Sequence, residues 1–119
     1  MLIKNEEYRV NFIDSNDVFV GYDMSHDCCE WFGWFIAPGL VTEHDEVEKL
    51  STETAPDVRG FVFDPTFGEQ LSFDYEGSLA VFRLVNDSGA VLFLHLFNSH
   101  NGYYGHGFDS NTVLGDGVL

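Results

Sequence analysis

The sequence has few basic residues, few cysteines and no long hydrophobic run. Only 5 Lys and Arg stand against 20 Asp and Glu in 119 residues, which gives a formal net charge of −15. Binding to a nucleic-acid backbone depends on Lys and Arg that neutralise phosphates, so direct nucleic-acid binding is disfavoured. No segment approaches the ~20 apolar residues needed to cross a bilayer. Anionic lipid would also repel the acidic surface, so we expect neither nucleic acid nor a membrane as a partner.

The N-terminus and the two cysteines bear on the compartment. Residues 1–7 lack the long apolar core of a signal peptide, so we expect the chain not to be exported. Cys28 and Cys29 are adjacent, and a disulfide between them would close almost no loop and stabilise little. Both observations predict the reducing environment of the cytoplasm.

Apolar residues are nevertheless abundant. Hydrophobic residues make up 45% of the chain, and 12 Phe, 5 Tyr and 2 Trp supply large aromatic side chains. The high charge alone would favour disorder, but this much apolar surface can offset the entropy lost on ordering. The length suits one domain, and no repeat or linker divides the chain. We therefore expect a single domain over 1–119, irregular from about residue 109, where glycines are frequent.

Alternating apolar and polar residues, interrupted by turn residues, predict mostly β-strands. The predicted elements are a hairpin over 7–23, strands at 60–63 and 70–73, and a second hairpin with arms at 79–85 and 90–97. The second hairpin has the strongest signal, because Asn86-Asp87-Ser88-Gly89 joins its two apolar arms. Asp64-Pro65 divides the strands at 60–63 and 70–73.

Helical signals are short. Asp45 and Lys49 form a favourable i,i+4 pair, which supports a short exposed helix within 42–50. A capping-box spacing permits a second helix over 28–36, but the apolar, Gly-interrupted run there fits a buried strand about as well. The sequence alone leaves both the helix and the strand open for this segment. The predicted fold class is α+β, mainly antiparallel β-sheet with one or two short helices.

The first cluster that could carry chemistry is His26-Asp27-Cys28-Cys29-Glu30. A catalytic interpretation uses a cysteine thiolate activated by His26, but acidic neighbours and the absence of Lys and Arg between Val10 and Glu48 disfavour a thiolate. Zinc prefers cysteines in spaced pairs, whereas adjacent cysteines bind one ion awkwardly. We favour a third interpretation, a small half-buried pair at a turn.

The second cluster is the segment 98–108, which is rich in Asn, Gly, Tyr and His. Its candidate site residues are His100, Asn101, Gly102, Tyr103, Tyr104 and His106. A metal site could combine Cys28 with the two histidines, but their spacing matches no known ligand pattern. The two tyrosines could form an aromatic platform for a ligand. The Asn-Gly pair is first of all a turn signal, so we favour core packing with a rigid turn.

Acidic residues occur along most of the chain. Those that we single out as a candidate interaction surface are Glu43, Asp45, Glu46 and Glu48. The plainer interpretation is a charged surface that keeps the protein soluble, and we favour it slightly. The sharper interpretation is that rows of carboxylates imitate nucleic-acid phosphates and occupy a basic groove on a partner. A calcium loop is not expected, because its alternating Asp or Asn pattern with a central Gly is absent.

Two motifs together resemble a known family. The Asp-Cys-Cys-Glu element at 27–30 and the Asn-Gly-Tyr-Tyr element at 101–104 are similar to elements of a small domain family of bacteriophage and prophage proteins that has no assigned activity. This chain differs by having His100 beside the second element and by its middle, 40–76. The resemblance implies a phage-like source, and hence the cytoplasm of a host cell. Small acidic phage proteins also resemble, in charge and size, inhibitors of host defence, several of which mimic DNA.

Three hypotheses about function follow. The favoured one is a non-enzymatic interaction protein, a host-defence inhibitor or DNA mimic, that binds a basic, nucleic-acid-binding protein; it needs no cofactor. The first alternative is a metal-binding or enzymatic domain, with zinc as the metal, which requires the two motifs to converge in one pocket. The second alternative is a structural or assembly protein, with the aromatic run 31–36 as a self-association surface.

Overall fold

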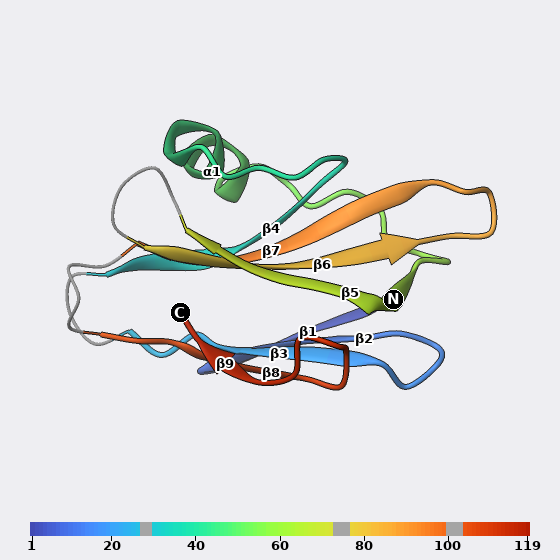
Figure 1. The fold of residues 1–119 in the computed structure, drawn as a ribbon, viewed down its shortest axis with the longest axis horizontal. Helices are drawn as coiled ribbons and strands as arrows, with labels where there is room; N and C mark the ends of the chain where they lie inside the picture. Colours follow the sequence, from blue (N-terminus) through green and yellow to red (C-terminus); the bar gives the residue numbers. More distant parts are fainter. Residues whose placement is uncertain (27–29, 73–76, 100–103) are drawn as a thin grey trace.

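The computed structural model describes residues 1–26, 30–72, 77–99 and 104–119, and Figure 1 shows their arrangement in two layers of β-sheet. In chain order the elements are β1 (Leu2–Glu6), β2 (Arg9–Ile13), β3 (Phe19–Asp23), β4 (Trp31–Ala37), α1 (His44–Ser51), β5 (Val62–Ser72), β6 (Ser78–Val85), β7 (Val91–Ser99), β8 (Gly107–Ser110) and β9 (Gly117–Val118). The fold is mostly antiparallel β-sheet with a single short helix among the described residues, so it is more sheet-dominated than an even α+β mixture.

The two sheets have different strand orders. The first sheet has the order β1-β2-β3-β8-β9, and the second has the order β4-β7-β6-β5. The chain passes from the first sheet to the second between β3 and β4, and it returns between β7 and β8. The ends of β3 and β7 and the starts of β4 and β8 all lie at one end of the two layers (Figure 1). Segments far apart in the sequence therefore meet at this end.

The main core lies between the sheets and follows from strand alternation. Val10 and Phe12 of β2 are fully buried, as are Val20 and Tyr22 of β3, and all four face the second sheet. The facing side chains are supplied by every second residue of the central strands β6 and β7. Each fully buried Phe or Leu contributes roughly 1.5–3 kcal/mol relative to exposure, which explains why a chain this charged folds.

A second core covers the outer face of the second sheet. Val47 of α1 is fully buried and packs with Phe35 and Ala37 of β4, and with Leu79 and Val81 of β6. Both faces of β4 and of residues 79–82 in β6 are therefore covered, so these stretches are continuously apolar instead of alternating. This arrangement decides the alternative left open for 28–36, because residues 31–37 form the strand β4.

The two predicted hairpins are confirmed as β2–β3 and β6–β7. The predicted short helix is α1. The two strands expected on either side of Asp64-Pro65 are instead one strand, β5, whose pairing with β6 shifts register between Phe63 and Gly68. Because β5 is at the edge of its sheet, Pro65 sits in the irregular stretch without breaking a central ladder.

The C-terminal region is irregular only in part, because residues 111–116 lie outside the strands whereas β8 and β9 border them. Phe108 of β8 is buried, β8 pairs with β3, and Leu119 is 3% exposed. The main chain of Leu119 makes two hydrogen bonds with that of His106, at 2.8 and 2.9 Å. Strand β1 was also not predicted. None of the described residues belongs to a helix that is long and apolar enough to span a membrane.

Candidate functional site

The candidate residues of the two motifs fall only partly within the described chain. Outside it are Asp27, Cys28, Cys29, His100, Asn101, Gly102 and Tyr103. Of the remaining four, His26 is exposed, Glu30 and His106 are buried, and Tyr104 is half-buried. Glu30 lies just before β4 and His106 just before β8, so the crossings between the sheets bring one residue of each segment together.

Glu30 and His106 form a buried pair. The distance from His106 Nε2 to Glu30 Oε1 is 3.1 Å, and the two side chains are 1% and 0% exposed. His106 Nδ1 lies 2.8 Å from the carbonyl oxygen of Asp23, which can only accept, so Nδ1 carries a hydrogen. The contact at Nε2 therefore also contains one proton, donated either by an imidazolium or by a protonated Glu30. This proton-sharing pair joins the two crossings.

Aromatic rings enclose this pair. Phe32 stacks on the His106 ring with centroids 4.1 Å apart, and Tyr22 lies 6.0 Å away in a tilted arrangement. The Tyr22 hydroxyl donates to the Phe97 carbonyl at 2.7 Å. Burial raises the pKa of Tyr22 strongly, and the Asp23 carboxylate adds to the effect, so the hydroxyl stays protonated.

The end of the second motif is held by Asn98. Its side-chain amide donates to the carbonyl oxygens of Tyr104 and Leu119, each at 3.0 Å. Both ring nitrogens of His106 are already hydrogen-bonded, so a metal ion there would have to displace Glu30 or the Asp23 carbonyl. Among the described residues of the two motifs, the geometry thus matches a structural connection better than an open ligand set.

His95, on β7, is a second buried histidine. Its Nδ1 donates to the Phe93 carbonyl at 3.1 Å, and its Nε2 accepts from the Val41 amide at 3.1 Å. Burial lowers the pKa of His95 from 6.5 to about 4, so the ring is neutral near pH 7. It stacks on Phe35 at 4.3 Å and anchors the connection between β4 and α1.

The four acidic residues singled out in the sequence lie on α1 or directly before it. All four are exposed: Glu43, Asp45, Glu46 and Glu48. Val47 alone fixes this helix through a fully buried side chain. His44, Asp45 and Glu48 also offer one ligand atom each within 4.8 Å of one another, but Asp45 and Glu48 are exposed and an acidic helix face commonly has this spacing without a metal.

Three of the chain's five Lys and Arg residues form ion pairs with carboxylates outside α1. The three arginines that pair with carboxylates are Arg9 with Asp109, Arg59 with Asp57, and Arg83 with Asp64. The hydrogen bonds from Arg59 hold the pKa of Asp57 at about 2, and those from Thr66 and Arg83 do the same for Asp64. None of these pairs involves the carboxylates around α1, so the negative charge there stays uncompensated by arginine.

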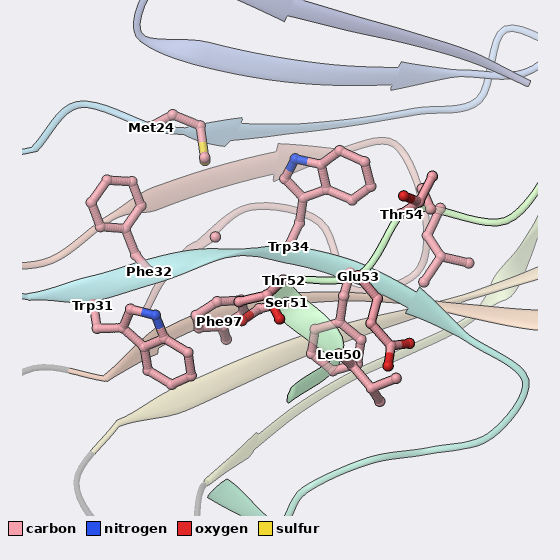
Figure 2. Close-up of a pocket in the computed structure, with 14 residues that line it drawn as sticks. Met24, Trp31, Phe32, Trp34, Leu50, Ser51, Thr52, Glu53, Thr54 and Phe97 are labelled. Atoms are coloured by element: carbon pink, nitrogen blue, oxygen red, sulfur yellow. The ribbon is translucent and has the colours of Figure 1, made fainter. Parts of the chain in front are cut away.

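A groove of about 490 Å³ runs along β4, beside the C-terminal end of α1 (Figure 2). Its lining residues are Met24, Trp31, Phe32, Gly33, Trp34, Phe35, Ile36, Leu50, Ser51, Thr52, Glu53, Thr54, Ala55 and Phe97. Both tryptophans of the chain belong to this lining. The aromatic run 31–36 was the only sequence signal for it, and a groove was not predicted because a covered strand has the same composition.

Comparisons of the chain with protein-family models, with curated proteins and with solved structures gave no match. Function must therefore be inferred from the geometry, burial and charge of the described residues. Two features combine accessibility with distinctive chemistry: the carboxylates around α1 and the aromatic groove beside them. The pair of Glu30 and His106, in contrast, is closed to solvent.

Proposed function

We propose that this chain is a non-enzymatic interaction protein that binds a basic protein, itself a nucleic-acid-binding protein, through the acidic surface around α1. We call this the α1 surface and define it by Glu43, Asp45, Glu46, Glu48 and Glu53, all exposed. The observation that carries the proposal is that Lys49 is the only Lys or Arg between residues 43 and 55. The three arginine pairs lie outside that segment.

Electrostatics explains what such a surface does. Like charges on a short helix repel one another, and a partner with a complementary positive surface relieves that repulsion on binding. The attraction steers the encounter over about 10 Å at 0.1 M salt and weakens as salt increases. Nucleic-acid-binding proteins carry such positive grooves, so carboxylates that take the place of phosphates make the chain a DNA mimic and a competitor of nucleic acid.

A low-salt pull-down from nuclease-treated bacterial lysate, read by mass spectrometry, tests the proposal. We expect the immobilised chain to recover nucleic-acid-binding proteins and to lose them when a DNA duplex or salt is added. The variant E43Q/E46Q/E48Q should recover far less. The control E6Q/E7Q/E69Q removes the same number of exposed carboxylates from β1, the turn after it and β5, and should behave as the unsubstituted chain. Recovery of no nucleic-acid-binding protein at low salt would overturn the proposal.

A further inference from the structure

We propose that the groove along β4 binds an extended segment of the basic partner, which adds to the second sheet as a β-strand and places Lys or Arg side chains in the groove. The inference rests on the proposed function and specifies which part of the partner is recognised. It is carried by three observations: the open edge of β4, the groove on both sides of that edge, and the negative charge beside it.

The first observation is that β4 has a strand neighbour, β7, on one side only. Among the residues that the structure describes, the backbone–backbone hydrogen bonds outside paired strands do not involve residues 31–37. An edge strand directs alternate amide and carbonyl groups away from its sheet, and an incoming strand pairs with them. Residues 35–37 are buried, whereas Trp31, Phe32 and Trp34 keep part of their surface exposed. The first half of β4 therefore offers main-chain hydrogen bonds to an extended segment.

The second observation is that the groove extends around both sides of this edge. On the α1 side, Trp31 and Leu50 line the groove and pack against the second core. On the side that faces the first sheet, Met24 and Trp34 line it (Figure 2). Side chains of a β-strand alternate between the two faces of a sheet. An added strand would place successive side chains alternately on these two aromatic surfaces.

The third observation is that the groove favours cations. Aromatic faces attract ammonium and guanidinium groups, and Trp is the strongest such partner. The C-terminal end of α1, which carries partial negative charge, contributes Ser51 and Thr52 to the wall, and exposed Glu53 follows them. The long apolar stems of Lys and Arg can cover the rings while their charged ends reach Glu53 and the rest of the α1 surface.

Charge also determines whether a basic partner or a second copy of this chain is the better occupant of the groove. Two copies could in principle pair β4 to β4, because edge strands are self-complementary. Each copy carries a formal charge of −15, and that pairing would bring two α1 surfaces close together. A basic segment gains attraction at the same place, so the groove is assigned to a basic partner.

The test uses the tryptophan fluorescence of the full chain, because both tryptophans line the groove. A short peptide of alternating Lys and Val is titrated at low salt, and a peptide of alternating Glu and Val serves as the control. We expect saturable binding of the Lys peptide only, with slowed amide exchange in β4. The same Lys peptide N-methylated along one edge should not bind, since it cannot donate to β4.

Charge reversal locates the bound peptide. E53K should weaken binding of the Lys peptide about tenfold, because it reverses a charge at the groove. E69K makes the same change on β5, at the opposite edge of the sheet, and should leave binding unchanged. Equal effects of the two variants, binding that survives N-methylation, or a stable dimer by light scattering would each overturn the inference.

The two proposals can fail separately. If the lysate experiment recovers nucleic-acid-binding proteins while the Lys peptide neither changes the fluorescence nor protects β4, the groove inference is wrong and the proposed function stands. If the peptide binds in the groove but no nucleic-acid-binding protein is recovered, the proposed function is wrong, and with it the identity assigned to the peptide's source.

Discussion

Because Glu30 and His106 share a proton, replacing Glu30 by alanine and replacing it by glutamine should change stability by different amounts. The Asp23 carbonyl fixes the hydrogen on Nδ1, so Nε2 of a neutral ring must accept a hydrogen bond. Alanine at position 30 offers no donor and leaves a cavity at a site that solvent does not reach. Glutamine keeps the size of Glu30 and can donate its amide to Nε2. Glutamine therefore retains both the hydrogen bond and the packing, whereas alanine removes both.

We predict that Glu30→Ala lowers the free energy of unfolding by about 1–3 kcal/mol, since a buried polar group loses its partner. Glu30→Gln should lower it by less, about 1 kcal/mol. Urea denaturation at pH 7 measures both values. Glu69→Ala is the matched control, because Glu69 is exposed on the edge strand β5 and a change there should be nearly neutral. Equal losses for the two Glu30 variants would contradict a stabilising role for a hydrogen-bond donor and for side-chain packing at position 30.

Single residues were recognisable in the sequence, but their pairing was not. Glu30 and His106 were each singled out within a motif, yet 76 positions separate them and no local pattern connects them. The two crossings bring them together, and the crossings depend on the order of strands in both sheets. His95 was not among the site residues singled out in the sequence, and its structural role comes from two hydrogen bonds with the main chain of Phe93 and Val41.

At the scale of elements, His95 connects β7 to the segment between β4 and α1. Its neutral ring accepts a hydrogen bond from Val41, and protonation would remove that acceptor. The folded-state pKa of about 4 lies below the ordinary value of 6.5. Between these values the unfolded chain binds a proton at His95 that the folded chain does not bind. Its contribution to stability is fully present above pH 6.5 and is lost as the pH falls toward 4.

We predict that the stability advantage of the unsubstituted chain over His95→Gln shrinks by as much as about 3 kcal/mol between pH 7 and pH 4. Urea denaturation of both proteins at several pH values gives this difference directly. Comparing the two proteins cancels the titration of the shared acidic residues. His44→Gln serves as the control variant, since His44 is only partly buried. A difference that does not vary with pH would mean that His95 titrates alike in both states.

The elements were predictable where a strand has one covered face. The alternation in β2 located that strand correctly, because one side of the first sheet faces the core and the other faces solvent. In β4 the same approach could not choose between helix and strand, since both faces are covered and the periodicity disappears. β8 and β9 are short and contain glycine, and their pairing with distant strands, not their composition, makes them strands.

At the scale of the whole molecule, two consequences of the net charge of −15 have opposite signs. Repulsion among carboxylates destabilises the folded chain, because folding brings them closer together. The same carboxylates attract a basic partner. Salt screens both interactions, and it acts mostly on exposed charges such as those of the α1 surface.

We therefore predict that raising NaCl from about 0.05 M to about 0.5 M increases the melting temperature and weakens binding of the Lys peptide in the same solutions. Differential scanning calorimetry and the tryptophan titration measure the two effects. In E43Q/E46Q/E48Q both salt dependences should be smaller, because three of the screened charges are gone. Sucrose at equal osmolality should raise the melting temperature without weakening binding, since it does not screen charge. If salt moves stability and affinity in the same direction, a single charged surface cannot account for both.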